Sequence, residues 1–199
     1  GGVHGIDFAA AQQQKKELKS LQKKYPEIQL FYGIEAEILP DGNLEFSSEE
    51  LFFFDFVIAA PHNIERRNID DPTEWICRAL TTPFVTMLAH PSGRRLPYKK
   101  GLDLDYQRLF AAAAKHNIIL EFNCSPWRMD LDWRQLRPAI EQGLLISVNP
   151  DAHEADELDS FLQSGISVLQ KAQIPKTHIF NTFSGQKIEK HFQKKKNLS

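Results

Sequence analysis

FVTMLAH, residues 84–90, is an apolar run that ends at a histidine. FVIAAPH (56–62) and LLISVNPDAH (144–153) repeat this form, whereas LFYGIE (30–35) ends at a glutamate and IILEFN (118–123) at an asparagine. Short runs rich in Ile, Leu, Val and Phe are typical of buried strands. We therefore expect strands that each carry a polar side chain at the carboxyl end.

The apolar runs alternate with longer amphipathic stretches, which is the pattern of repeated β/α units. The predicted strands are Gln29–Glu35, Phe54–Ala60, Phe84–Ala89, Ile118–Phe122, Leu144–Val148 and, with the weakest pattern, His178–Thr182. The predicted helices are Phe8–Lys24, Thr73–Leu80, Asp105–His116, Asp132–Gln142, Asp156–Lys171 and a last helix capped by Ser184. Each connection is long enough to contain a helix, so the strands are expected to be parallel. No glycine-rich phosphate loop follows a strand, which favours a (β/α) barrel over an open doubly wound sheet.

Composition sets broad limits on the function. The 199 residues, 42% hydrophobic and 25% charged, suit one globular domain, and a net charge of −2 indicates neither nucleic-acid nor membrane binding. No apolar run approaches the roughly 20 residues that span a bilayer. The two cysteines, Cys77 and Cys124, form no CxxC pair. We expect a reduced, cytoplasmic protein without a thiolate metal site.

The polar residues at the predicted strand ends recur at intervals of about one β/α unit. In a (β/α) barrel the carboxyl ends of the strands form one rim, where active sites are built. A single histidine at a strand end is more often structural, but a repeated set in register is harder to explain by packing. The candidates are Glu35, His62, His90, Asn123, Asp151 and His153.

The side-chain types in this set indicate metal chemistry. Imidazoles and carboxylates without thiolates suit zinc, manganese or iron. A rim that carries several of them can hold two or three ions close together, which activates water and offsets charge on a phosphoryl group. The sequence therefore predicts hydrolysis of a phosphate ester.

Five segments, YGIEAEILPDG, DFVIAAPH, MLAHPSGR, LEFNCSPWRMDL and NPDAH, resemble in order and spacing the PHP (polymerase and histidinol phosphatase) domain. The version at the C-terminus of bacterial family X DNA polymerases is the most similar. The resemblance implies an α/β fold, a distorted (β/α)7 TIM-like barrel, with two or three manganese, zinc or iron ions. It also implies ligand roles: Glu35 bridges two metals, His62 and His90 bind one of that pair, Asp151 binds the other, and His153 binds the third. Glu35, Asp151 and His153 would be the catalytic residues.

The start of the chain departs from the family pattern. The family opens with a strand that carries His-x-His and a second strand that ends in Asp-His, and neither motif is present. The chain begins with Gly1-Gly2, and His4 falls after the place of the second motif, so His4 is not assigned as a ligand. We expect residues 1–199 to be a single PHP domain that lacks its N-terminal part.

Other residues near the motifs have two interpretations each. Arg94, Arg95, Asn123 and Arg128 follow strand ends, and their side chains either hold a substrate phosphate or are ordinary loop groups. Trp127 either stacks on a base or packs. Glu121 is expected to point into the barrel wall. The remaining histidines, His116, His178 and His191, are expected at the surface or at helix ends.

The resemblance predicts a metal-dependent phosphoesterase, most specifically a 3′–5′ exonuclease and 3′-end processing domain that acts on DNA ends and is attached to an N-terminal polymerase domain. Two alternatives stay open. One is a stand-alone phosphatase that acts on a small phosphomonoester. The other is a barrel without catalytic activity, whose role is structural or in binding.

Overall fold

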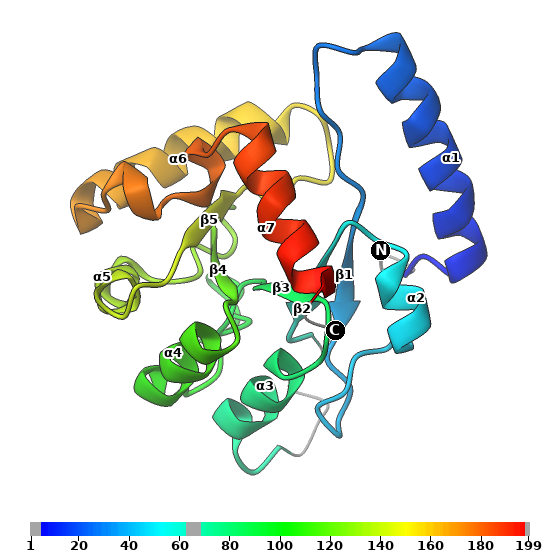
Figure 1. Ribbon diagram of the computed structural model, residues 1–199. Helices are drawn as coiled ribbons and strands as arrows, with labels where there is room; N and C mark the ends of the chain where they lie inside the picture. The colour runs from blue at the N-terminus through cyan, green and yellow to red at the C-terminus, as the bar shows by residue number, and fades with distance from the viewer. Residues whose placement is uncertain (1–4, 63–68, 198–199) are drawn as a thin grey trace.

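The computed structural model describes residues 5–62 and 69–197, and His4 lies outside this range. Within it, five parallel strands form one sheet in the order β1-β2-β3-β4-β5 (Figure 1). The strands are β1 (Gly33–Glu37), β2 (Phe56–Ala60), β3 (Val85–Leu88), β4 (Ile119–Asn123) and β5 (Ile146–Asn149). The helices are α1 (Phe8–Lys24), α2 (Ser48–Phe52), α3 (Pro72–Leu80), α4 (Tyr106–Lys115), α5 (Trp133–Glu141), α6 (Glu157–Ala172) and α7 (Gly185–Asn197). Strands that follow each other in sequence are neighbours in the sheet, so their carboxyl ends lie along one edge.

Aspartates cap the helices that lead away from that edge. Asp71 accepts a hydrogen bond from the backbone of Glu74 at the start of α3, and Asp105 does the same for two N–H groups of α4. Asp132 caps α5 in the same way. Such caps satisfy N–H groups that have no partner within the helix. The predicted starts of these helices are therefore confirmed by their caps.

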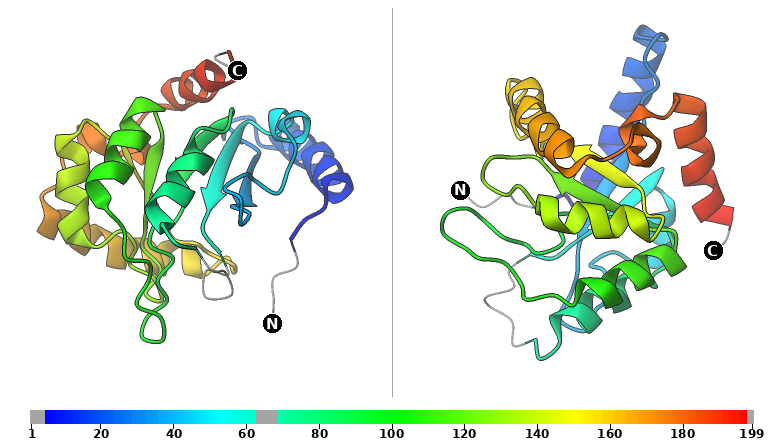
Figure 2. Two further views of the ribbon diagram at one scale, coloured as in Figure 1. Left: turned by 90° about the horizontal axis from the view of Figure 1, so that it is seen from below. Right: turned by 90° about the vertical axis from the view of Figure 1, so that its left-hand side faces the viewer.

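One face of the sheet carries the main core. Helices α3, α4 and α5 lie side by side over it (Figures 1 and 2). Phe110 of α4 and Phe122 of β4 are completely buried in this layer. Burying a large apolar side chain contributes about 1.5–3 kcal/mol. This layer therefore holds the strands, and the residues at their ends, in fixed register.

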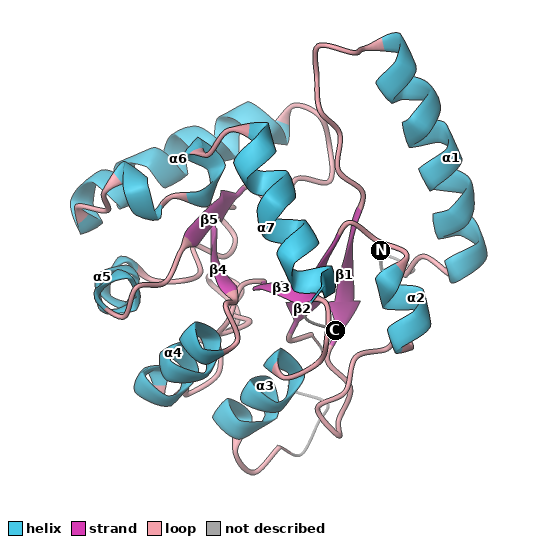
Figure 3. Cartoon of the chain, viewed as in Figure 1, coloured by secondary structure: helices cyan, strands magenta, loops and turns pink. Residues whose placement is uncertain are grey.

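The other face of the sheet is covered by α7 and is partly open. Phe192 of α7 stacks on Phe56 of β2 with ring centroids 4.8 Å apart, and it meets Phe31 edge-on at 5.3 Å. Together with Phe180 and Met87 these rings form a smaller cluster separate from the main core. Figure 3 shows α7 lying across the sheet at this point.

The predicted strand His178–Thr182 is wrong. Two short 3-10 turns, Lys176–His178 and Phe180–Thr182, occupy this stretch, with a single parallel bridge between Ile146 and Ile179. The side chain of Asn181 explains the difference: its oxygen accepts the N–H of Val148 at 2.7 Å, and its amide donates to the carbonyl of Val148 at 3.0 Å. An amide side chain thus satisfies the β5 backbone where a strand would have paired.

The fold agrees with the α/β part of the prediction. The described residues form a five-stranded parallel sheet with helices, and closure into a seven-stranded barrel stays a prediction. In residues 5–62 and 69–197, none of the helices combines the length and apolar character that crossing a membrane requires.

Candidate metal centre

Three of the predicted ligands meet at the carboxyl edge of the sheet. Glu35 lies in β1, His62 follows β2, and His90 follows β3. The Nε2 atom of His62 lies 3.1 Å from Oε1 of Glu35, and the Nε2 atom of His90 lies 3.4 Å from the same oxygen. One potential ligand atom from each residue lies within 4.8 Å of the others. A single cation can be reached by all three side chains.

His90 is the most constrained member of this group. Its side chain is 1% exposed, and neither ring nitrogen has a hydrogen-bond partner among the described residues. Buried polar groups without partners are rare in folded proteins and require an explanation. A cation beside Glu35 would supply the missing partner of one nitrogen. The donor set and this buried imidazole therefore fit a divalent metal ion.

The charges of the group reinforce one another. Burial opposes ionisation of Glu35, but the attraction of the nearby imidazoles of His62 and His90 outweighs it and lowers the pKa of the carboxyl. Burial likewise opposes protonation of His90, and the carboxylates of Glu35 and Glu121 outweigh it and raise its pKa. Glu35 is thus an anion over the whole physiological pH range, as a metal ligand must be.

Glu121 of β4 connects the centre to the next strands. It was expected to point into the barrel wall, but its carboxylate lines a cavity at the site. Oε2 accepts the N–H of His90 at 2.7 Å and the amide of Asn123 at 3.2 Å, while Oε1 accepts the amide of Asn149 at 2.9 Å. Burial raises the pKa of Glu121 to about 7. Glu121 is not in the three-residue group, so its contribution is to fix the backbone of His90.

Asp151 and His153 stand apart from the three-residue group. The Oδ2 atom of Asp151 accepts a hydrogen bond from Nε of Arg128 at 2.8 Å and from Nδ2 of Asn123 at 3.0 Å. The ring of His153 is 61% exposed, and its Nδ1 lies 2.9 Å from the carbonyl oxygen of Asp151. The structure therefore places this pair beside the rim without joining it to Glu35.

The predicted phosphate-binding residues have different environments. Asn123 is completely buried, and Arg128 is occupied by Asp151. Arg94 donates from Nε to the carbonyl of Arg128 at 2.6 Å and lies 3.6 Å from Asp132. Arg95 is exposed. Three of the four side chains thus bind protein groups, and their role toward a phosphate stays a prediction.

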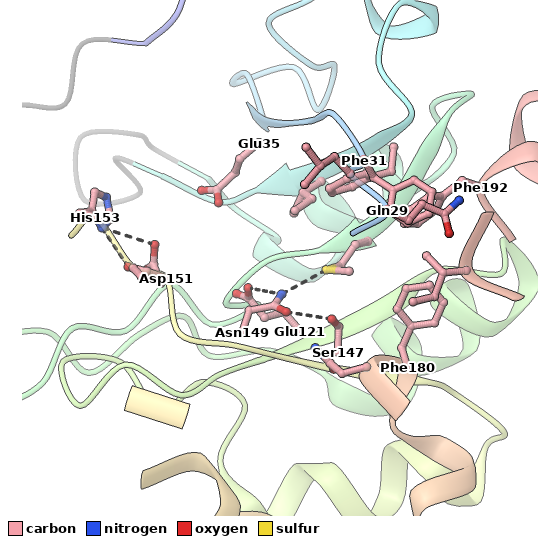
Figure 4. Close-up of a pocket in the computed structure, with 17 residues that line it drawn as sticks. Gln29, Phe31, Glu35, Glu121, Ser147, Asn149, Asp151, His153, Phe180 and Phe192 are labelled. Atoms are coloured by element: carbon pink, nitrogen blue, oxygen red, sulfur yellow. Dashed lines mark hydrogen bonds and ion pairs between the residues drawn. The ribbon is translucent and has the colours of Figure 1, made fainter. Parts of the chain in front are cut away.

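A cavity of about 620 Å³ joins Glu35, Asp151 and His153 to the open face of the sheet. Figure 4 shows Glu35, Asp151 and His153 at one end and Phe180 and Phe192 at the other. The polar end lies at the carboxyl edge of the strands, and the apolar end lies under α7. A ligand in this cavity would meet the acidic and imidazole groups at one end only.

Sequence reasoning missed residues that hold the ligands in place. Ser92 donates from both its N–H and its hydroxyl to Oδ2 of buried Asp130, which fixes the turn after His90. Asn149 bridges from β5 to Glu121. Ser92 lies in MLAHPSGR, Asp130 in LEFNCSPWRMDL and Asn149 in NPDAH, so all three belong to segments that carry candidate ligands. Alternation along β4 would have placed Glu121 on the face opposite Leu120 and Phe122, which was the available signal.

Comparison with known proteins reveals relatives in bacteria, and no family model matches the chain. It is 31% identical over 94% of its length to the DNA polymerase/3′-5′ exonuclease PolX of Bacillus subtilis. It is 27% identical over 90% of its length to a probable phosphatase of Thermoanaerobacter sp.. The chain spans 33% of the polymerase and 74% of that phosphatase. A probable phosphatase of Acetivibrio thermocellus is 26% identical over 85% of the chain.

These homologues bear out the resemblance to a PHP domain related to the C-terminal region of family X polymerases. The matches cover nearly the whole chain, so they include all the segments that carry the candidate ligands. The probable phosphatases and the polymerase share this region although the activities in their names differ.

Proposed function

We propose that this chain is a metal-dependent hydrolase acting on phosphoester bonds. The observation that carries the proposal is the group of Glu35, His62 and His90, whose ligand atoms lie within 4.8 Å of one another. Relatives named as phosphatases and as a 3′-5′ exonuclease support the same class of chemistry. Glu35 of this group lines the polar end of a cavity, where a substrate has access to its carboxylate.

The ligand roles form the second part of the proposal. Glu35, with one oxygen near both imidazoles, is the bridging carboxylate, and His62 and His90 complete one metal position. Asp151 and His153 serve further metal positions, so the centre holds two or three manganese, zinc or iron ions. Glu35, Asp151 and His153 are the catalytic residues. Support comes from their shared position around one cavity.

The substrate proposed first is a DNA 3′ end, cleaved by 3′–5′ exonuclease or 3′-end phosphoesterase activity. It is supported by the similarity to PolX over 94% of the chain. In this proposal residues 1–199 are one domain of a distorted (β/α)7 barrel, and an N-terminal polymerase domain belongs to the whole protein. The parallel sheet supports that architecture.

The protein's own groups suit the hydrolysis of a phosphate. A bound divalent ion would activate water and neutralise charge on the phosphoryl group. The exposed ring of His153 lines the cavity beside Asp151, where it would hold a metal ion near the substrate phosphate. Arg128 lies beside Asp151 with 12% of its side chain exposed, in position to pair with a phosphate if the carboxylate is neutralised.

The test is manganese-dependent degradation of a 3′-labelled single-stranded DNA by this chain. The variants Glu35→Gln and His90→Ala should lose activity more than about 100-fold. Each changes a side chain that would bind the metal directly, and such changes cost more than the loss of a residue that only supports a ligand. His178→Ala, outside the site, is the matched control and should keep activity. Wild-type-like hydrolysis by both site variants would contradict the metal centre. Hydrolysis of neither DNA nor small esters, with manganese bound, would instead favour the barrel without catalytic activity.

A second candidate is a stand-alone phosphatase that acts on a small phosphomonoester. It is supported by the similarity to a probable phosphatase, 27% identical over 90% of the chain. The two candidates differ in the ratio of kcat/KM for an oligonucleotide to kcat/KM for p-nitrophenyl phosphate. A phosphatase should cleave the small ester and leave the labelled oligonucleotide intact, which would overturn the DNA assignment while keeping the hydrolase.

A further inference from the structure

Two loops at the carboxyl edge of the sheet are tied to each other. One follows β3 and contains a hairpin in which Arg95 and Lys99 exchange backbone hydrogen bonds of 3.0 and 2.6 Å. The other follows β4 and contains Trp127. The N–H of Leu96 donates to the carbonyl of Trp127 at 2.6 Å, and Arg94 donates to the carbonyl of Arg128. The two loops therefore form one surface, which Figure 2 shows projecting from the sheet.

Large aromatic rings on this surface face solvent. Tyr98 is 90% exposed and Trp127 is 60% exposed. Within residues 5–62 and 69–197, neither ring contacts another aromatic ring or a cation. Aromatic side chains ordinarily bury most of their surface, so exposed rings with no role in packing indicate a contact surface. Trp127 is thus mostly exposed, and packing accounts for less than half of its surface.

The surroundings of the rings are basic and lie close to the candidate centre. Arg95 and Lys100 are exposed in the hairpin. Trp127 directly precedes Arg128, whose Nε lies 2.8 Å from Asp151. Trp127 is thus the chain neighbour of a residue that contacts Asp151, which lines the polar end of the cavity. Aromatic faces interleaved with cations are the combination that binds single-stranded nucleic acid, by stacking on bases and pairing with phosphates.

We propose that Tyr98 and Trp127 form a stacking platform for bases of a single-stranded nucleic acid, with Arg95 and Lys100 pairing with its phosphates. The proposal rests on the proposed phosphoesterase function and specifies how that site takes hold of a strand. Bases stacked on the two loops keep the sugar–phosphate chain beside the rim, so that the strand end reaches the centre. A small phosphate ester would not use this platform.

The test measures binding separately from hydrolysis. A short fluorescein-labelled oligothymidylate is titrated with the metal-free chain, and its fluorescence anisotropy is recorded. Trp127→Ala should weaken binding roughly tenfold, the value of one base stacked on an aromatic ring, and Trp127→Phe should recover most of it. Tyr98→Ala should act in the same direction, and its ring is too exposed for the change to unfold the chain. Tyr25→Ala, which removes a 41% exposed ring next to α1, is the matched control.

The outcomes separate the two proposals. Equal affinity of wild type, Trp127→Ala and Tyr98→Ala, or no measurable binding of the oligonucleotide, would overturn the platform and leave the rings for another kind of partner. Loss of binding in the variants, with no hydrolysis by manganese-loaded wild type, would overturn the phosphoesterase and keep the platform. If the protein is active, Trp127→Ala should also lower kcat/KM for the oligonucleotide relative to kcat/KM for p-nitrophenyl phosphate.

Discussion

Two histidines of this chain bury ring nitrogens without hydrogen-bond partners in the described structure, and their surroundings are opposite. His90 follows β3 and faces the carboxylates of Glu35 and Glu121, which outweigh its burial and raise its pKa. His191 lies inside α7, 5.3 Å from the ring of Phe180. Burial first, and then Lys195 and Lys194, lower the pKa of His191. The first site attracts a cation, and the second repels one.

The comparison shows that a buried imidazole nitrogen alone does not indicate a metal ligand. His90 has a carboxylate oxygen 3.4 Å away and the ring of His62 at a centroid distance of 5.1 Å. His191 has aromatic neighbours and lysines instead. The additional requirement is an anion and a second donor at the same point in space. Only one of the two histidines meets it.

The largest effect should come from removing one histidine at a time. His90→Ala removes a side chain that would bind the metal directly, and it should weaken manganese binding more than about 100-fold. That is more than the loss expected from removing a residue that only supports a ligand. His191→Ala should leave manganese affinity unchanged. Isothermal titration calorimetry of both variants measures the difference directly. Equal manganese affinity of wild type and His90→Ala would remove the distinction between the two histidines.

The second effect concerns Asp151, whose carboxylate lies outside the group of Glu35, His62 and His90. Arg128→Gln leaves Asp151, whose side chain is 19% exposed, without its cation. We expect a loss of about 2 kcal/mol in the free energy of unfolding, less than the loss from a fully buried pair. Manganese should recover part of this loss, because a cation at Asp151 replaces the guanidinium. Urea unfolding with and without manganese tests both statements.

A matched control exists for this variant. Arg134 pairs with Asp132 at 3.0 Å, but its side chain is 66% exposed. Exposed ion pairs contribute little to stability, so Arg134→Gln should change the free energy of unfolding by less than about 1 kcal/mol. If manganese stabilised Arg128→Gln no more than it stabilised Arg134→Gln, Asp151 would not be a metal ligand.

Much of this arrangement was predictable from the sequence, because strand-end residues of parallel strands must share an edge. That rule brought Glu35, His62 and His90 together, although the predicted strand Gln29–Glu35 lies at Gly33–Glu37 and Glu35 is in its middle. It does not specify what each side chain meets there. Arg128 and Asp151 belong to different loops, and their ion pair depends on how the chain folds after β4 and β5. From residue type, Asp151 was predicted to bind metal and Arg128 to bind a phosphate. In the structure these two side chains form an ion pair with each other.

The errors have physical causes as well. The stretch His178–Thr182 has strand-like composition, but the amide of Asn181 satisfies the β5 backbone in place of a strand. The short helix α2 was missed although Ser47 and Glu50 form its capping box, a pattern that is readable from sequence. His191 was expected at the surface or a helix end, yet it lies inside α7 and is half-buried. Only tertiary packing determined that α7 turns this residue toward Phe180.

The third effect tests Glu121 as a positioning residue. Its carboxylate accepts N–H groups from His90, Asn123 and Asn149. Glu121→Ala removes both acceptor oxygens, so the N–H of His90 loses its partner and the backbone of His90 can shift. We expect about tenfold weaker manganese binding, within the range for outer partners of a metal ligand. Unchanged affinity would mean that His90 is held by packing alone, and a competition titration with a chelating dye would detect either result.

The smallest effect is the pH dependence that His191 adds to stability. Because its pKa is lowered in the folded chain, the unfolded state binds more protons as the pH falls below the ordinary value of about 6.5. The contribution of His191 is therefore fully present above that pH, and it is lost as the pH falls toward the lowered folded value. His191→Phe removes the titration and keeps an aromatic ring beside Phe180, so its free energy of unfolding should fall less on acidification than that of wild type. Parallel curves for the two proteins would mean that the imidazole of His191 protonates as freely in the folded chain as in the unfolded one, and the contrast with His90 would then rest on ligand geometry alone.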